Sequence, residues 1–182
     1  MSPAPRIETD RLTFTGHRLE DFADCCALWT DPEVTRFIGG KPSTTQEVWF
    51  RLLRYVGHWS LLGFGFWVAR EKTSGRFVGE VGFAEHRRGL EQAGEGLEQA
   101  GEGPELGYAL APWCYGQGFA TEAVRAAVAW GDAHLPTSRT WCLINPEAKA
   151  SIRVAEKCGY RELARTPLFG APVILLERSA DE

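Results

Sequence analysis

The hydrophobic and polar positions of this 182-residue chain follow two periods, and together they predict a mixed α/β arrangement. Short alternating or continuous apolar segments predict strands, and apolar residues that recur every three to four positions predict helices. The predicted strands are residues 7–12 with an extension toward Phe14, 64–70, 77–84, 105–111, 139–144, an extended segment from Tyr160 onward, and 172–177. The predicted helices are residues 20–30, a helix that starts near 43–47 and carries an apolar stripe to Val56, 119–133 and 148–158.

Local signals mark several ends of these elements. Asp31-Pro32 is expected to stop the first helix, because the residue before proline avoids the helical region. Ser43 with Gln46, or Thr44 with Glu47, fits a capping box at the start of the second helix. Gly159 follows the last helix, where a left-handed cap is typical.

The short turn at 72–75 joins the strands 64–70 and 77–84 as an antiparallel hairpin. Residues 89–95 read GLEQAGE, and residues 96–102 repeat these letters. Two glycines per heptad cost about 2 kcal/mol of helix propensity, so residues 89–103 are interpreted as a flexible acidic loop rather than a coiled coil. No segment resembles a domain linker, and we expect a single domain over residues 7–178.

Composition narrows the class of function. A formal net charge of −4 argues against non-specific nucleic-acid binding, which needs a basic surface. The five cysteines include no C-x-x-C pair and the four histidines are scattered, so neither a disulfide framework nor a metal site is expected. The first residues lack an apolar signal region, and no stretch reaches the roughly 18 apolar residues of a membrane span. We therefore expect a cytoplasmic protein with no membrane or nucleic-acid partner.

The most informative local feature is a predicted strand, then Gly116-Gln117-Gly118, then a predicted helix. The first turn of a helix has unpaired N–H groups and a partial positive charge, and glycines let an anion approach the backbone. The phosphate-loop pattern G-x-x-x-x-G-K-[ST] is absent. A dinucleotide site is disfavoured because Thr121 stands where its third glycine belongs. A tight turn without a ligand stays open as the alternative.

Three separated segments give the glycine turn a context. They are 8–12, ETDRL; 105–110, ELGYAL, followed by 115–123, YGQGFATEA; and 145–160, with NPE, ASIRV and EKCGY in that order. In order and spacing, over nearly the whole chain, they resemble the GCN5-related N-acetyltransferase (GNAT) superfamily, and within it the RimJ/RimL-type branch that acetylates protein N-termini. The resemblance implies a mixed, largely antiparallel sheet of about six to seven strands with helices on both faces and splayed fourth and fifth strands.

The resemblance also implies site residues and a cosubstrate, acetyl-CoA, with no metal. The pyrophosphate would be bound by the segment Tyr115, Gly116, Gln117, Gly118, Phe119, Ala120 and Thr121. The pantetheine arm would contact Leu110, Ala111, Asn145 and Ser151. Glu105 is the implied general base, with Glu80 on the neighbouring strand as the second candidate, and Ser151 is the implied acid.

Some positions depart from the family pattern. Ala148 stands where the last helix usually has asparagine, which removes a hydrogen bond to the pantetheine. Ala155 stands where relatives with a tyrosine acid carry it, and Thr15 replaces a second arginine of the opening strand. Tyr115 stands where arginine or glutamine is common, although this branch often has an aromatic residue there.

The chemistry requires a neutral amine, because its lone pair attacks the thioester, so a base must remove a proton. We expect direct transfer to a primary amine, either a peptide N-terminus or a small amine. A homodimer is compatible with the family. Two other hypotheses stay open: an idle acyl-CoA-binding or regulatory domain, and a nucleotide-binding oxidoreductase.

Overall fold

The computed structural model describes residues 4–86, 103–168 and 170–180. The strands are β1 (Ile7–Glu8), β2 (Leu12–Thr15), β3 (Phe66–Glu71), β4 (Phe77–Ala84), β5 (Glu105–Leu110), β6 (Arg139–Ile144), β7 (Arg161–Leu168) and β8 (Ala171–Ser179). The helices are α1 (Phe22–Trp29), α2 (Pro32–Thr35), α3 (Thr45–Leu62), α4 (Phe119–His134) and α5 (Lys149–Lys157). Short 3-10 turns occur at Leu19–Asp21 and Pro112–Cys114.

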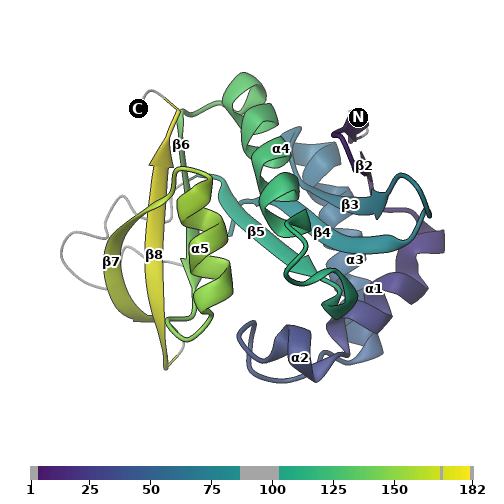
Figure 1. The fold of residues 1–182 in the computed structure, drawn as a ribbon, viewed down its shortest axis with the longest axis horizontal. Helices are drawn as coiled ribbons and strands as arrows, with labels where there is room; N and C mark the ends of the chain where they lie inside the picture. Colours follow the sequence, from purple (N-terminus) through teal and green to yellow (C-terminus); the bar gives the residue numbers. More distant parts are fainter. Residues whose placement is uncertain (1–3, 87–102, 169, 181–182) are drawn as a thin grey trace.

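All eight of these strands form one sheet in the order β1-β2-β3-β4-β5-β6-β8-β7. Every neighbouring pair is antiparallel except β5 and β6, which are parallel and are paired only at Glu105 and Trp141. Beyond that pair the two strands diverge toward their carboxyl ends, so the predicted splay is confirmed (Figure 1). The predicted mixed, largely antiparallel sheet is confirmed as well.

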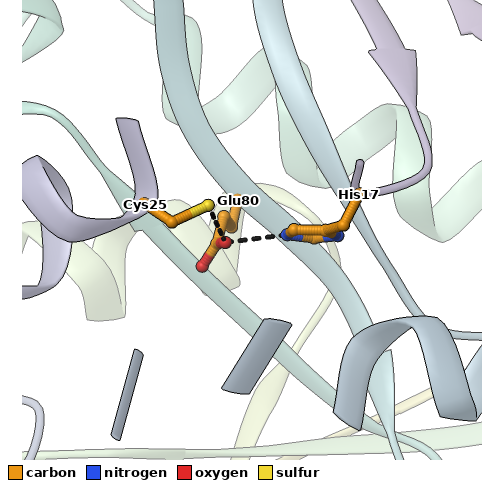
Figure 2. A group of neighbouring side chains, drawn as sticks. All are labelled: His17, Cys25 and Glu80. Carbon is orange, nitrogen blue, oxygen red and sulfur yellow. Dashed lines mark hydrogen bonds and ion pairs between the residues drawn. The ribbon is translucent and has the colours of Figure 1, made fainter. Parts of the chain in front are cut away.

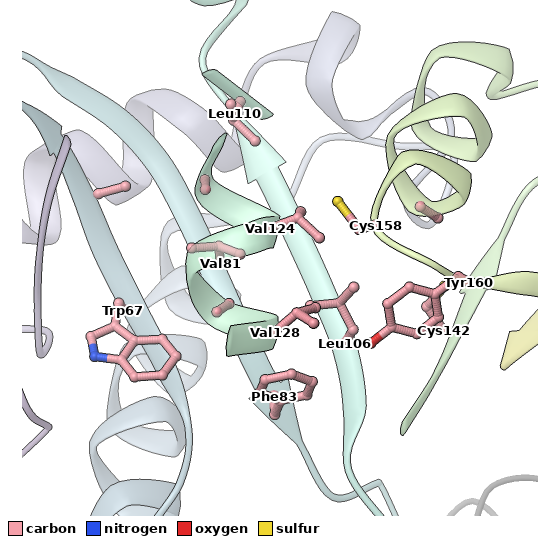
Figure 3. Packing of buried hydrophobic residues seen from close by; sticks show 14 of the residues in the cluster. Trp67, Val81, Phe83, Leu106, Leu110, Val124, Val128, Cys142, Cys158 and Tyr160 are labelled. Carbon is pink, nitrogen blue, oxygen red and sulfur yellow. The ribbon is translucent and has the colours of Figure 1, made fainter. Parts of the chain in front are cut away.

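Helices cover both faces of this sheet. The α4 and α5 helices lie on one face, and α1, α2 and α3 lie toward the other (Figure 1). Val124 and Val128 of α4 pack with Leu106 and Leu110 of β5 in the main hydrophobic cluster (Figure 3). A second cluster joins α1, α2 and α3 to the opposite face of β3, β4 and β5. Burial on both faces explains why β4 reads as a nearly continuous apolar run.

The amino-terminal prediction was wrong in one respect. Instead of one strand over 7–14, the chain reverses, so that β1 and β2 pair with each other, Ile7 opposite Phe14. The reversal is held at Thr9, whose amide donates to the Leu12 carbonyl at 3.0 Å and whose hydroxyl accepts from the Leu12 amide at 3.0 Å. This turn adds the strand that the prediction of six to seven strands lacks.

The second difference concerns Asp31-Pro32. It does end α1, but it also begins α2: the Asp31 carboxylate accepts from the Glu33 amide at 2.8 Å. A four-residue helix is too short to show periodicity, so the sequence could not predict it. Of the two capping pairs left open, the structure selects Thr44 with Glu47 for α3.

The remaining local predictions concern the β3–β4 hairpin, the cap of α5 and the loop over 89–103. The hairpin of β3 and β4 is confirmed, and Gly159 adopts the expected left-handed conformation with φ +90°. The predicted loop over 89–103 lies outside the described residues except for Gly103. In the described part of the chain, no helix is both long and apolar enough to traverse a lipid bilayer.

Candidate functional site

A cavity of about 670 Å³ opens where β5 and β6 diverge. Its walls come from α2 and the loop after it, from the carboxyl half of β5, from the turn before α4 and from α5. The strand divergence therefore creates the site, because side chains of a continuous sheet would fill this space.

The turn before α4 is shaped by two glycines. Gly116 and Gly118 have φ of +73° and +81°, in the left-handed region that L side chains rarely adopt. The helix has no side-chain cap, and the backbone amide of Glu122, which donates to the Gly118 carbonyl at 3.1 Å, makes its first backbone bond. The amides of residues 119–121 precede that bond, so helix geometry leaves them without an intrahelical acceptor. Unpaired amides at the positive end of a helix form an anion site.

Contacts from the turn between β1 and β2 hold the turn before α4 in place. The Arg11 guanidinium donates to the Gln117 carbonyl at 2.9 Å and to the Glu122 carboxylate at 2.6 Å, and it lies 4.2 Å over the Phe119 ring. The Thr9 hydroxyl donates to Glu122 at 2.6 Å. Burial raises the pKa of Glu122, but these hydrogen bonds outweigh it and leave the pKa below its ordinary value. The sequence predicted no role for Arg11, since only long-range contact reveals it.

The charge around the cavity suits an anionic ligand. Four basic side chains line it, from Arg36, Lys149, Arg153 and Lys157. Two acidic ones, from Glu33 and Glu147, do so as well. A cleft with an excess of positive charge raises the local concentration of anions.

A hydrogen bond crosses the strand divergence at Tyr108. Its hydroxyl donates to the Ser151 carbonyl at 2.7 Å, which fixes the distance between β5 and α5. Ser151 and Ala148 both line the cavity. Ala148 occupies the N-cap position of α5 and makes no side-chain cap bond. Where relatives have asparagine, this chain therefore lacks both a cap for the helix and a polar group in the cavity wall.

Seven of the predicted residues line this cavity. They are Leu110, Tyr115, Gly116, Gly118, Ala120, Thr121 and Ser151. The structure brings these together from three segments that are up to 41 positions apart in the chain. The turn and the last helix, which were linked only by resemblance, therefore face one space.

Five predicted residues lie outside the cavity lining, and their roles stay predictions. The Ala111 amide donates to Val78 of β4 at 2.8 Å, so by strand alternation the Leu110 backbone edge faces the divergence instead. Phe119 is buried in the core, and the Gln117 side chain donates to the Trp113 carbonyl. The Asn145 side chain accepts from the Glu147 amide at 2.8 Å and thereby shapes the turn into α5.

Glu105, the fifth of these residues, lies at the closed end of the divergence, where β5 still pairs with β6. Tyr108 is the first residue of β5 to line the cavity. The two are three positions apart along the strand, which corresponds to about 10 Å. A role of Glu105 in proton transfer, which stays a prediction, would therefore need intervening water.

Glu80 forms a separate buried centre on β4 (Figure 2). Only 1% of it is exposed, and its carboxylate contacts His17 Nε2 at 2.7 Å, Cys25 Sγ at 3.2 Å and Trp29 Nε1 at 2.6 Å. Burial raises its pKa, but these hydrogen bonds outweigh the desolvation and hold the pKa below 4.5. Burial also raises the pKa of the Cys25 thiol.

The sequence did not reveal this cluster, because its members lie on three separate elements. Ligand-type atoms of His17, Cys25 and Glu80 lie within 4.8 Å of one another, a spacing that a metal ion could bridge. The hydrogen bonds of 2.7 and 3.2 Å already account for that proximity. Within the described residues we therefore interpret the cluster as a hydrogen-bonded core centre.

Comparisons with known proteins agree with this geometry. Residues 11–161 match the sequence family described as the Acetyltransferase (GNAT) domain. An uncharacterized protein of Bacillus subtilis, YkkB, is 28% identical over 99% of both chains. The structure of a putative GnaT-family acetyltransferase from Bordetella pertussis is 30% identical, with a TM-score of 0.81 over 97% of this chain and 100% of that one. Spermidine N-acetyltransferase from Vibrio cholerae, solved with CoA and spermine, shares the fold at 16% identity, with a TM-score of 0.73 over 95% and 98% of the two chains. The chain therefore belongs to the GNAT family and is an acetyl-CoA-dependent N-acetyltransferase.

Proposed function

We propose that this enzyme transfers the acetyl group directly to a primary amine and belongs to the RimJ/RimL-type branch. One observation carries the proposal: a single cavity joins the unpaired amides at the start of α4 to the divergence of β5 and β6. A CoA pyrophosphate at the amides would direct the pantetheine arm along β5, toward the unpaired strand edge at Leu110. That edge offers N–H donors to the thioester oxygen as negative charge develops on it.

Direct transfer is supported by the state of the cavity's cysteine. Cys114 is 2% exposed and its thiol donates to the Ala111 carbonyl at 2.9 Å. Burial raises the pKa of this thiol to about 11, so the thiol is protonated at neutral pH. A protonated thiol is a poor nucleophile, which argues against an acyl-cysteine intermediate.

The acceptor in this proposal is a primary amine, with a protein N-terminus favoured by the branch resemblance and a small amine as the alternative. The attack forms the N–C bond, breaks the C–S bond and releases the CoA thiol, while the ammonium proton passes to a base. Ser151, which lines the cavity beside Tyr108, would bind the pantetheine and donate a proton to the leaving thiolate.

Glu105 is the proposed base, acting through water. Glu105 is half-buried, whereas Glu80 is 1% exposed and both of its oxygens accept hydrogen bonds in the core. A carboxylate whose pKa is lowered by such bonds is also a weaker base. Glu80 is therefore kept as the second candidate, with a structural role as its alternative.

Thiol release tests this proposal. The protein is mixed with acetyl-CoA and a panel of N-terminal peptides and small amines, and CoA production is followed with a thiol reagent. We expect at least one amine to stimulate release, and mass spectrometry to find the acetyl group on that amine. Slow release that no amine accelerates would instead support the idle-domain alternative.

The base is tested by Glu105→Gln beside Glu80→Gln. We expect Glu105→Gln to lower kcat by about 100-fold with retained affinity for CoA. Glu80→Gln should lower the melting temperature first. A Glu105→Gln rate within a factor of two of wild type would assign the base to Glu80 or to water alone.

A further inference from the structure

A second cavity adjoins the first, between the loop after α2 and the first half of α3. Its volume is about 400 Å³, and its lining includes Lys41, Arg51 and Arg54. Ile38 lines both cavities, so they meet at this side chain. We name the second one the basic cavity, after those three cations.

The basic cavity holds more positive charge than its own lining neutralises, with three cations against one carboxylate. Glu47 is the one acidic residue of its lining, and its carboxylate already accepts from the Thr44 amide at 2.6 Å and hydroxyl at 3.0 Å in the α3 capping box. Across residues 4–86, 103–168 and 170–180, the ion pairs formed by lysine and arginine involve other side chains, such as Arg11, Arg70 and Arg178. Like charges gathered at one concavity attract an anion.

Arg51 is the best-fixed of the three cations. Its guanidinium lies 3.7 Å over the Trp29 ring, and its Nη1 atom lies 3.5 Å from the Tyr55 hydroxyl. The Arg51 Nε atom is buried and has no hydrogen-bond partner in the described part of the chain. A guanidinium that is held over an aromatic ring can present its remaining N–H groups as a fork, which suits an oxyanion.

A single residue, Trp29, connects the basic cavity to the buried Glu80 carboxylate. Trp29, which lies under Arg51, donates its indole N–H to Glu80 at 2.6 Å. Glu80 in turn lies on β4 opposite Ala109, and Ala109 lines the larger cavity. A molecule that spans Ile38 would therefore place one end beside Arg51 and Arg54 and the other end beside the strand divergence.

We infer that the basic cavity binds an oxyanion of the acceptor, so that the acceptor is a primary amine that also carries a carboxylate or a phosphate. The inference rests on the proposed amine transfer and names the class of its substrate. The amine would lie in the larger cavity, and the oxyanion would lie across Ile38 against the arginine fork. Polyamines, which carry only positive charge, would be repelled.

The first test compares acceptors that differ by one charge. The pairs are the peptide amides Ala-Asp and Ala-Asn for a carboxylate, and phosphoethanolamine and ethanolamine for a phosphate. We expect the wild type to favour the charged member of at least one pair by about tenfold or more in kcat/KM, because charge-assisted hydrogen bonds are strong. The pair that shows the preference identifies the oxyanion.

Variants then connect that preference to the cavity. Lys41→Gln combined with Arg54→Gln removes two exposed cations without uncovering Trp29, and we expect the preference to fall below about threefold. Arg165→Gln, which removes an exposed cation on β7, should keep it. A wild type that favours neutral or polyamine acceptors, or a preference that survives the double variant, would overturn the inference.

A binding measurement separates this inference from the proposed function. With saturating CoA present, glutarate and inorganic phosphate are titrated while the melting temperature is followed. We expect one of them to stabilise the wild type and neither to stabilise the double variant. If no amine is acetylated but this difference is seen, amine transfer fails and the oxyanion site stands.

Two outcomes of the same measurement contradict the oxyanion site. An absence of stabilisation by either anion would show that the cavity does not bind them. A calorimetric loss of CoA affinity in the double variant would assign the cations to the phosphates of CoA instead. A comparison with dephospho-CoA would then show which phosphate they bind.

Discussion

Two polar regions of this molecule, one around Glu80 on β4 and one at the start of α4, differ in how their hydrogen bonds are satisfied. Around Glu80, His17, Cys25 and Trp29 surround one carboxylate, and the region is sealed from solvent. At the start of α4, the amides of residues 119–121 have no intrahelical acceptor, and Gly118, Ala120 and Thr121 line a cavity. The Glu80 carboxylate is fully paired on folding, although the buried Nδ1 atom of His17 has no partner among the described residues, whereas the amides of the second region are available to a ligand.

The difference indicates that the Glu80 region contributes mainly to stability and that the start of α4 contributes mainly to ligand binding. Buried polar groups that pair with one another contribute to a unique core, and removing one partner leaves the others unsatisfied. Polar groups that the fold leaves unpaired at a cavity are available to an external anion. Substitutions in the two regions should therefore have opposite signatures, a loss of stability in one and a loss of affinity in the other.

Glu80→Ala should have the largest effect, and on stability. The substitution leaves the donors of His17, Cys25 and Trp29 buried without an acceptor. We therefore expect a loss of about 3–5 kcal/mol in the free energy of unfolding, measured with urea. Affinity for CoA should be retained below the unfolding transition. Glu162→Ala, which breaks an exposed pair with Arg165, is the control and should change little. A stable Glu80→Ala protein that fails to bind CoA would remove the distinction between the two regions.

Gly118→Asp should have the next largest effect, and on affinity. Aspartate tolerates the left-handed conformation better than most residues, but it adds a carboxylate where the phosphate would bind. We expect CoA affinity to fall by about 100-fold in calorimetry, with a loss in the urea midpoint no larger than that of a control that carries the same backbone strain. Gly63→Asp, at φ +75° with no atom near its Cβ position, is the matched control for backbone strain. Equal affinity in wild type and Gly118→Asp would contradict the anion site.

Ala148→Asn should raise affinity rather than lower it, because it adds a polar group at the cavity. Asparagine favours the N-cap, and its amide can also reach a ligand in the cavity that Ala148 lines. We expect CoA affinity to rise about three- to tenfold, together with a stability gain of about 1 kcal/mol. Ala148→Ser can cap α5 without reaching as far, so it should raise stability alone. A gain of affinity with serine equal to that with asparagine would attribute the effect to capping.

The pH dependence of the Glu80 region gives the smallest expected effect. The pKa of Glu80 is lowered from 4.5 in the folded chain, so the unfolded chain binds more protons between the two pKa values. The stabilisation is therefore fully present above about 4.5 and is lost as the pH falls through the lower pKa. Urea unfolding of wild type and Glu80→Gln from pH 7 to pH 3 should show a stability difference that shrinks below about 4.5. A difference that grows toward acid would mean that the folded-state pKa is raised.

The sequence predicted the elements that depend on local pattern. Alternation located β5 and β6, and the Gly116–Gly118 turn has the two positive φ angles that its glycines suggest. Because these residues are neighbours in the chain, the physics that fixes them is local. Much of the cavity lining was predicted as well, because the turn before α4 and the helix α5 had each been assigned to one site.

The rest depended on contacts between distant residues. The Glu80 centre joins His17, Cys25 and Trp29 across separations of 51 to 63 positions, and no short motif encodes that meeting. Asn145 differs from that case, because its side chain accepts from the Glu147 amide within its own turn, a local contact that its predicted role did not consider. The reversal between β1 and β2 was missed for a different reason: two strands of two and four residues are too short for a period to be read.

The contacts of Arg11 with the turn before α4 have a consequence for the order of events after synthesis. The residues that shape the turn are separated from Arg11 by 106 to 111 positions, so the turn acquires its final form only when both ends of that long interval have met. Contacts of such high sequence separation form late and slowly. Affinity for CoA should therefore appear in the last phase of refolding. The rate at which CoA binding is regained would then measure the rate at which the chain completes its fold.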